Sequence, residues 1–226
     1  MKNQLTEEKK AQYLAIHEIV IDKTKYVQWM QKPFSFDDKT ASTEGHIMAI
    51  TPFIGGYKLR PVKNIYPVKA TMLASFKVSR LAEAIKNAPM IDCYDEEEIE
   101  CDACNGIGKV TTSFYYQGRM YEIESECPLC AGEGVFYKRS DKPNGKKEFN
   151  SVDRLKIGQS FYKYELIEKV LKIATVLNAD EINVLDQSNG MYMCLNGTDV
   201  EIILMNCMVN EDYNPADTIE LTPKIS

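Results

Sequence analysis

The chain has 226 residues, of which 44% are hydrophobic and 27% charged, and its formal net charge is -6. It has no run of the roughly 18 apolar residues that a membrane-spanning helix needs, and its N-terminus lacks the apolar segment of a secretory signal. We therefore expect a cytoplasmic globular protein without membrane association, built as one large domain or two small ones.

The N-terminal part of the chain mixes helix and strand patterns. Thr6 can cap a first helix; from Ile16 the pattern becomes richer in strand-forming residues, and it fits neither a helix nor a strand clearly through Met30. Ser79 can cap a second helix. The expected elements after the first helix are two strands within 39–51 around a turn at Glu44-Gly45, a loop over 52–67, a strand over 69–78, a helix over 79–88 and a strand over 90–94.

The C-terminal part has a clearer order of elements. A polar connection over 138–148 precedes it. The pattern then predicts a strand over 152–161, a helix over 162–177 and strands over 181–185, 191–195 and 200–209. This order is βαβββ, and the strand, helix and strand over 69–94 begin the same order.

Four of the seven cysteines stand in two copies of one phrase, CDACNGIG over 101–108 and CPLCAGEG over 127–134. Both copies follow C-x-x-C-x-G-x-G. Structural zinc takes four tetrahedral ligands and readily binds thiolates. The repeat therefore predicts one zinc ion, bound by Cys101, Cys104, Cys127 and Cys130. The odd total of cysteines argues against a disulfide framework.

The other three cysteines receive simpler interpretations. Cys194 and Cys207 lie in apolar runs and are expected to be core residues. Cys93 lies close to the first pair and is an alternative ligand that we disfavour.

The predicted zinc site is structural, because four cysteines leave no open position for a catalytic water. Gly106 and Gly132 are expected to adopt positive φ, which lets backbone amides point at the sulfurs. The 22 residues between Cys104 and Cys127 hold two strand-forming segments around Gln117-Gly118. That pattern predicts a hairpin that returns the second cysteine pair to the first.

The repeated phrase closely resembles the cysteine-rich zinc region of DnaJ-type co-chaperones, over about residues 101–134. That family carries four such repeats and two zinc ions, so two repeats imply one ion here. Its His-Pro-Asp signature is absent, because His17 precedes Glu18 and His46 precedes Ile47. The resemblance thus implies a zinc module inserted into another fold.

Two further segments resemble bacterial β sliding clamps. Residues 41–49 (ASTEGHIMA) are similar to their A-T-D-G-H-R-L-type strand and turn, with Glu44 in place of Asp and Ile47 where Arg is common. Residues 200–206 (VEIILMN) are similar to the I-M-P-type strand that ends a clamp repeat, with Asn206 in place of Pro. The resemblance covers about 140 residues in pieces. It implies an α+β, DNA-clamp-like fold of βαβββ repeats with antiparallel sheets, and helices on the face that meets DNA. A closed ring would require a homo-oligomer.

Charge is distributed unevenly along the chain. Residues 91–135 carry 11 acidic and two basic residues, whereas residues 51–90 carry seven basic residues and one acidic residue. A basic face can simply be solvated, or it can bind a polyanion such as nucleic acid. The candidate nucleic-acid-binding residues are Lys58, Arg60, Lys63, Lys69, Lys77, Arg80, Lys86, Lys163, Lys169 and Lys172.

These observations predict a non-enzymatic zinc protein with a clamp-like fold. We expect it to associate with DNA or the replication machinery through its basic surface, and with a protein partner through the zinc hairpin. The expected domains are residues 1–94 and 141–226, which form the clamp-like part, and the inserted zinc hairpin over 95–140. No catalytic residue is predicted, because the two histidines have no matching nucleophile and no phosphate-binding loop is present.

The alternative is a protein-interaction or chaperone-like zinc module that binds no nucleic acid. The hairpin aromatics Phe114, Tyr115, Tyr116 and Tyr121 would carry that function. Aromatic residues on a hairpin more often pack onto their own domain, so this signal by itself is ambiguous.

Overall fold

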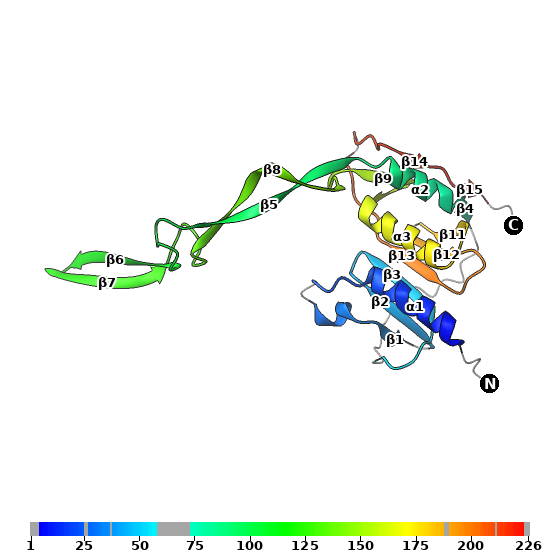
Figure 1. Ribbon diagram of the computed structural model, residues 1–226, viewed down its shortest axis with the longest axis horizontal. Coiled ribbons are helices and arrows are strands. Elements are labelled where there is room, and N and C mark those ends of the chain that lie inside the picture. The colour runs from blue at the N-terminus through cyan, green and yellow to red at the C-terminus, as the bar shows by residue number, and fades with distance from the viewer. Residues whose placement is uncertain are drawn as a thin grey trace. The chain divides into compact units, whose positions relative to one another are not determined.

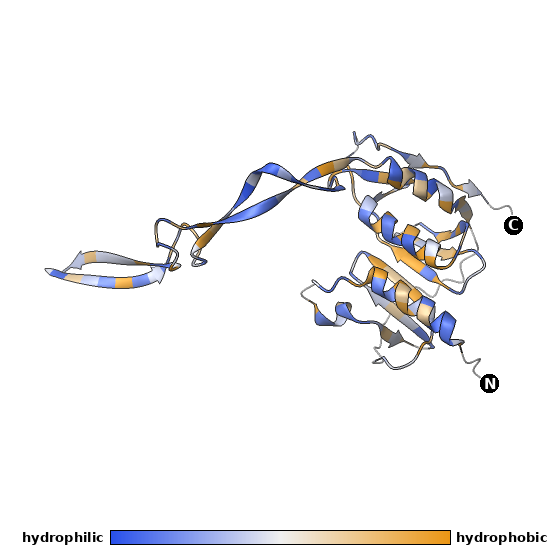
Figure 2. Cartoon of the chain, viewed as in Figure 1, coloured by the Kyte–Doolittle hydropathy of each residue, from blue (hydrophilic) through white to orange (hydrophobic). Residues whose placement is uncertain are grey.

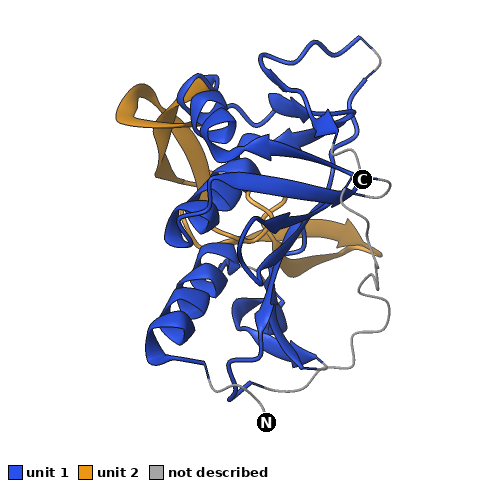
Figure 3. Ribbon diagram, turned by 90° about the vertical axis from the view of Figure 1, so that its right-hand side faces the viewer, with its two compact units in different colours: residues 1–89, 149–226 blue, residues 90–148 orange. Residues whose placement is uncertain are grey.

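The computed structural model describes residues 5–24, 27–36, 38–57, 73–187, 190–210 and 212–223. The chain divides into two compact units (Figure 3): unit 1 comprises residues 1–89 and 149–226, and unit 2 comprises residues 90–148. The predicted insert over 95–140 lies inside unit 2, which also takes in the ends of the two flanking segments.

An eight-stranded sheet, with antiparallel neighbours throughout, forms the centre of unit 1 in the described part of the chain. In spatial order its strands are β1 (Phe34–Phe36), β2 (Lys39–Thr43), β3 (Ile47–Pro52), β13 (Glu201–Leu204), β12 (Met191–Leu195), β11 (Glu181–Asp186), β4 (Ala74–Lys77) and β15 (Thr222–Pro223). A smaller sheet contains β10 (Ser160–Lys163), β9 (Arg154–Ile157) and β14 (Thr218–Ile219). The prediction of an α+β fold with antiparallel sheets is confirmed, and the one parallel pair in the described chain is β9 with β14.

Three helices cover one face of the large sheet (Figure 1), and their buried residues belong to the same apolar core as those of the sheet. They are α1 (Glu7–Val20), α2 (Val78–Lys86) and α3 (Tyr164–Val176); a short 3-10 helix, η1 (Gln28–Gln31), precedes β1. Side chains alternate across a strand, so β12 buries Met191, Met193 and Leu195 against the helices and leaves Tyr192 and Cys194 half-buried. The main core of unit 1 therefore lies between the helices and the sheet.

Helix α1 extends further than its sequence pattern indicated. Thr6 caps it as expected, because its Oγ1 accepts a hydrogen bond from the Lys9 amide at 3.3 Å. The helix then continues through Ile16 to Val20, so the strand-rich interpretation of this stretch was wrong. Its buried residues, Tyr13, Ile16, His17 and Val20, recur at helical spacing. Packing of that face outweighs the strand preference of its β-branched residues.

The C-terminal order β10, α3, β11, β12 and β13 reproduces the predicted βαβββ sequence. Two boundaries differ. The expected strand over 152–161 is a hairpin of β9 and β10, which turns at Gly158, and β13 ends at Leu204, well before Val209. Helix α2 begins at Val78, so Ser79 lies in its first turn and does not cap it.

The two segments that resemble sliding clamps are neighbours in the sheet. Strands β2 and β3 lie on either side of the Glu44-Gly45 turn, and β3 pairs with β13 so that Met48 faces Ile203. On the face away from the helices, Trp29 and Phe34 pack against this part of the sheet.

Unit 2 contains four strands in two pairs. Strands β5 (Met90–Glu100) and β8 (Val135–Phe149) form a ribbon, and β6 (Lys109–Tyr116) and β7 (Arg119–Glu126) form a hairpin (Figure 1). The predicted hairpin at Gln117-Gly118 is confirmed by the register, which runs from Lys109↔Glu126 to Tyr116↔Arg119.

The expected polar connection over 138–148 was wrong, because this segment belongs to strand β8. It pairs with the acidic strand β5, and opposite charges explain the pairing. Lys147 Nζ lies 3.9 Å from Asp92, Asn144 donates a hydrogen bond to Asp95 at 2.8 Å, and the Arg139 guanidinium stacks 3.6 Å above the Tyr94 ring. Figure 2 shows how polar most of this ribbon is.

Candidate metal centre

The four predicted ligands come together in unit 2. The Sγ atoms of Cys101, Cys104, Cys127 and Cys130 all lie within 4.8 Å of one another, and all four residues are buried. The Cys101–Cys127 and Cys104–Cys130 sulfurs are 3.8 and 3.7 Å apart. A tetrahedron with Zn–S bonds of about 2.3 Å has edges of about 3.8 Å. The cluster therefore has the size and donor set of a site for one tetrahedral zinc ion.

The two copies of the repeated phrase make matching hydrogen bonds. The Gly108 amide donates to Cys104 Sγ at 3.3 Å, and the Gly134 amide donates to Cys130 Sγ at 3.2 Å. The Cys101 amide donates to the Gly134 carbonyl and the Cys127 amide to the Gly108 carbonyl. Such amide donors offset the negative charge of thiolates.

The glycines of each phrase have different roles. Gly106 and Gly132 adopt positive φ (75° and 86°), as expected, but the amides that reach the sulfurs belong to Gly108 and Gly134. A Cβ on Gly108 would lie 2.2 Å from the Gly132 carbonyl oxygen, and a Cβ on Gly134 would lie 2.2 Å from that of Gly106. The two turns pack backbone to backbone, which only glycine permits at these positions.

Two cysteines of the cluster differ in acidity. A backbone hydrogen bond from Cys130 lowers the pKa of Cys127 to about 7. Burial raises the pKa of Cys101 to about 11.

A glutamate precedes each copy of the phrase, and neither glutamate was among the predicted site residues. The Glu100 side chain lies over Gly106, where an added Cβ would be 2.9 Å from it. The Glu126 side chain lies over Gly132 in the same way, at 3.4 Å from an added Cβ. The repeat is therefore nine residues long, E-C-x-x-C-x-G-x-G, and this signal was present in the sequence. Cys93, Cys194 and Cys207 are half-buried and lie outside the cluster.

Apart from the metal site, unit 2 has almost no interior. All of its residues are described, and the buried ones are the four cysteines with Gly108 and Gly134. Its large apolar residues are exposed instead, among them Ile107 (72%), Tyr115 (74%) and Leu129 (67%). The cysteine cluster is thus the core of this part of unit 2.

The predicted nucleic-acid-binding residues lie in unit 1, and four of them, Lys58, Arg60, Lys63 and Lys69, fall outside the described residues. Most of the others are ion-paired. The pairs are Lys77–Asp180, Arg80–Glu83, Lys169–Glu44 and Lys172–Glu168. Lys86 and Lys163 have no ion pair within the described parts of the chain.

Lys169 differs from the rest in its surroundings. Its side chain is 21% exposed, and its Nζ donates to Glu44 Oε2 at 2.8 Å and to the Val20 carbonyl at 3.4 Å. It ties α3 to the β2–β3 turn and to the end of α1.

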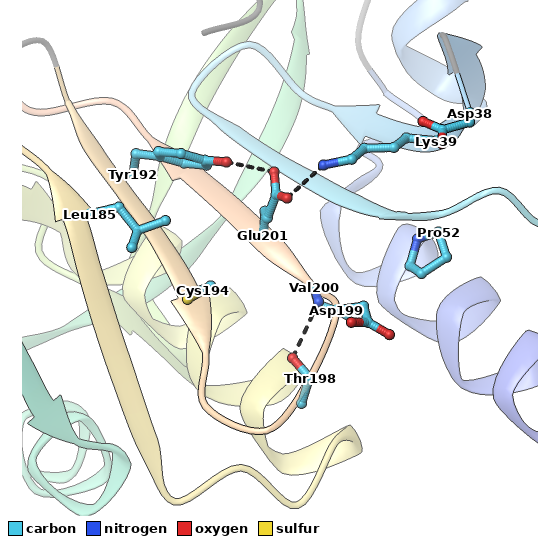
Figure 4. Close-up of a pocket in the computed structure, with 10 residues that line it drawn as sticks. All are labelled: Asp38, Lys39, Pro52, Leu185, Tyr192, Cys194, Thr198, Asp199, Val200 and Glu201. Atoms are coloured by element: carbon cyan, nitrogen blue, oxygen red, sulfur yellow. Dashed lines mark hydrogen bonds and ion pairs between the residues drawn. The ribbon is translucent and has the colours of Figure 1, made fainter. Parts of the chain in front are cut away.

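A polar pocket lies on the sheet face of unit 1, over β12 and β13 (Figure 4). At its centre, Glu201 accepts hydrogen bonds from Lys39 Nζ and Tyr192 Oη, each at 2.6 Å. Burial, together with this hydrogen bond, raises the pKa of Tyr192. Both carboxylate oxygens of Glu201 are thus engaged within the protein.

Comparison with known proteins gives matches among solved structures alone. No protein-family model matches the chain, and no curated protein matches it. The structure is similar to a DNA polymerase sliding clamp from Pseudomonas aeruginosa (12% identity, TM-score 0.45), over 89% of this chain and 64% of that one. It is also similar to a sliding clamp from Bartonella birtlesii (11% identity, TM-score 0.45), over 89% of this chain and 64% of that one. A further similar structure is the DNA polymerase III subunit beta from Borrelia burgdorferi (12% identity, TM-score 0.43), over 93% of this chain and 67% of that one.

The chain spans slightly less than two thirds of the Pseudomonas aeruginosa clamp. None of the described helices has the length and apolar character required to cross a membrane.

Proposed function

We propose that this chain is a non-enzymatic zinc protein in which one structural zinc ion, held by the four cysteines, folds unit 2 as a protein-contact module. The contrast within unit 2 carries this proposal. Its buried residues belong to the metal site, whereas apolar side chains such as Ile107 and Leu129 are exposed. Clustered exposed apolar side chains with polar surroundings mark interaction surfaces.

Zinc would supply the folding free energy that this unit cannot draw from apolar burial. Structural zinc sites contribute about 10–16 kcal/mol of apparent binding free energy at neutral pH. The protein's own part is to bring four thiolates together on two turns and to stabilise them with the Gly108 and Gly134 amides.

Native mass spectrometry tests the metal. We expect one zinc ion per chain, lost on chelation and lost in Cys127→Ser. The control is Cys207→Ser, which removes a cysteine outside the cluster and should retain the ion. A metal-free wild-type protein after purification in zinc, or full zinc occupancy in Cys127→Ser, would refute the site.

Affinity purification from the cells that make the protein tests the contact role. Extracts are treated with nuclease, and the wild type is compared with the double variant Phe114→Ser and Ile123→Ser. Both side chains are exposed, so zinc content should not change. We expect a protein partner retained by the wild type and lost by the variant; equal recovery by both would reject the role of the hairpin.

A second candidate function is clamp-like association with nucleic acid, as part of the replication machinery. It is supported by the adjacency in the sheet of the two clamp-resembling segments and by the exposed basic residues Arg80, Lys86 and Lys172 on the packed helices α2 and α3. The self-association that a ring requires belongs to the same proposal.

Binding to duplex DNA at several salt concentrations tests this candidate, because phosphate contacts weaken steeply with salt. Lys86→Glu with Lys163→Glu should weaken binding at least about tenfold and reduce the salt slope. The matched control is Lys23→Glu with Lys32→Glu, which makes the same charge change elsewhere in unit 1. Salt-independent or absent binding would remove this candidate.

A further inference from the structure

The β6–β7 hairpin has two chemically different faces. Alternate residues of a strand point to opposite faces, and directly paired residues share one. The pairs Phe114↔Tyr121 and Thr112↔Ile123 lie on one face. The rings of Phe114 and Tyr121 stack there, with their centroids 5.6 Å apart. We call Thr112, Phe114, Tyr121 and Ile123 the apolar face.

The opposite face is acidic along β7. It carries Glu122, Glu124 and Glu126 at alternate positions of β7, paired with Ser113, Thr111 and Lys109 of β6. The pair Tyr115↔Met120 lies on the same face, beside the turn. Lys109 Nζ approaches Glu124 at 3.2 Å. Glu122 and Glu126 have no ion pair in the described chain. We call these three glutamates the acidic face.

The outer edge of β7 has no neighbouring strand. Within the described residues, β6 and β7 form a sheet of their own. An edge strand presents unpaired N–H and C=O groups, which can pair with another extended chain. A strand added here would place its side chains alternately over Tyr121 and Ile123 and beside Glu122, Glu124 and Glu126.

We propose that the edge of β7 binds, by strand addition, an extended segment of a partner protein in which apolar and basic residues alternate. This inference rests on the proposed protein-contact function of unit 2 and specifies the chemistry of its partner. Backbone hydrogen bonds would supply affinity, and the two faces would select the side chains.

The charge of unit 2 favours a basic partner over nucleic acid or a second copy. Unit 2 contains 13 acidic and seven basic residues, whereas unit 1 contains 20 of each, so unit 2 accounts for the whole net charge of -6. Binding of single-stranded nucleic acid combines aromatic stacking with a positively charged groove. Pairing of β7 with β7 of a second copy would bring like charges together.

The glutamates could serve instead only to keep an exposed edge strand from aggregating. The two roles differ in what charge reversal does. Reversal would redirect a binding edge toward acidic segments, whereas purely protective charges act with either sign, so that reversal would produce no new specificity.

Fluorescence anisotropy with the zinc-loaded full chain tests the proposal, using labelled peptides as long as β7, which has 8 residues. One peptide alternates Val and Lys, a second has the same composition in two blocks, and a third alternates Val and Glu. We expect the alternating basic peptide to bind, the block peptide to bind at least about tenfold more weakly, and the acidic peptide not to bind.

The variant Glu122→Lys with Glu124→Lys should retain one zinc ion and prefer the acidic peptide. Its control, Glu18→Lys with Glu220→Lys, makes the same net-charge change on exposed residues of unit 1 and should behave as wild type. The proposal would be overturned if the wild type bound the alternating and block peptides equally, or if it bound single-stranded nucleic acid more tightly than the peptides. It would also be overturned if the β7 variant kept the wild-type preference, or if self-association were the only effect of that variant. If the hairpin still captures a partner in the affinity purification, the contact function stands and the inference alone fails.

Discussion

At the scale of single residues, Gly134 and its counterpart Gly108 are the two glycines of the candidate metal site whose added Cβ would overlap backbone atoms. The φ of Gly134 is +80°, and a Cβ there would lie 2.2 Å from the Gly106 carbonyl oxygen. Because the backbone of one turn would have to move away from the other, Gly134→Ala should separate the two turns. Zinc affinity should then weaken at least about tenfold, or about 1.4 kcal/mol. Competition with a chelator of known affinity measures this change.

The matched control for that substitution is Gly118→Ala in the hairpin turn. Gly118 has a similar φ of +73°, but nothing lies within 4 Å of an added Cβ. The Gly118→Ala variant therefore has the cost of an alanine at positive φ without the steric overlap, and its zinc affinity should stay within about threefold of wild type. Equal losses in both variants would show that backbone strain alone, and not the close approach of the turns, sets the effect.

His17 gives a second prediction at this scale, on pH. It is fully buried, its Nδ1 lies 2.8 Å from Ser42 Oγ and its Nε2 lies 3.0 Å from Thr51 Oγ1. The Thr51 hydroxyl donates to the Pro52 carbonyl, so Nε2 donates to Thr51 and Nδ1 accepts from Ser42. Burial lowers the pKa of His17 from 6.5 to about 4. The neutral ring is thus the native form.

The sign of the pH effect follows from the lowered pKa. Between pH 6.5 and about 4 the unfolded chain binds a proton at His17 that the folded chain excludes. The contribution of the neutral His17 to the free energy of unfolding is therefore complete above pH 6.5 and is lost as pH falls to about 4. The loss from this residue should reach about 3 kcal/mol. The free energy of unfolding of unit 1, measured against pH, should fall more steeply in the wild type than in His17→Gln; parallel curves would contradict the prediction.

At the scale of elements, the β5–β8 ribbon depends on charge more than on burial. Strand β5 has six acidic and no basic residues, and β8 has five basic and two acidic residues. Individual pairs are exposed, as in Lys147–Asp92, and each contributes well under about 1 kcal/mol. Many weak pairs along one ribbon nevertheless add up, and salt screens all of them.

Hydrogen exchange in rising salt tests this dependence. Raising the ionic strength from about 0.05 to about 1 M shortens the screening length severalfold. Amide exchange in β5 and β8 should accelerate severalfold, whereas exchange in the turns around the cysteines should not change. Equal protection of the ribbon at both salt concentrations would show that its backbone pairing does not need the charges.

The elements also show what the sequence could and could not predict. The clustering of the four cysteines, the hairpin at Gln117-Gly118 and the helix stripes followed from local spacing, because the CxxC repeat, the turn signal and the periodicity are local patterns. The strand over 138–148 did not, since its pattern is polar and its partner β5 is distant in sequence: Asn144 contacts Asp95, 49 residues earlier. The end of α1 was missed for the same reason: packing onto α3, β3 and β2 decides it. Pairing over a long sequence separation leaves no mark in a local pattern.

At the scale of the whole molecule, the two units are stabilised by different means. Unit 1 has a core of fully buried apolar residues from three helices and the sheet, including Ile16, Leu81 and Ile167. In unit 2, all of whose residues are described, the cysteines take that place. Isolated two-stranded ribbons are at best marginally stable in water. The metal should therefore control the folding of one unit and not of the other.

Removal of zinc should consequently unfold unit 2 and leave unit 1 intact. In the presence of a chelator, we expect amides of residues 101–134 to lose nearly all protection from hydrogen exchange, while those of α3 and β12 retain theirs, because no metal ligand lies in unit 1 among the described residues. Cys127→Ser should reproduce this pattern without a chelator, and Cys207→Ser should not. Loss of protection in α3 on chelation would mean that the units fold as one cooperative structure, and retained protection in the hairpin would mean that strand pairing alone holds the turns together. Either result would contradict the prediction that the metal folds unit 2. The expected result would mean that the β7 edge forms a binding surface only when zinc is bound.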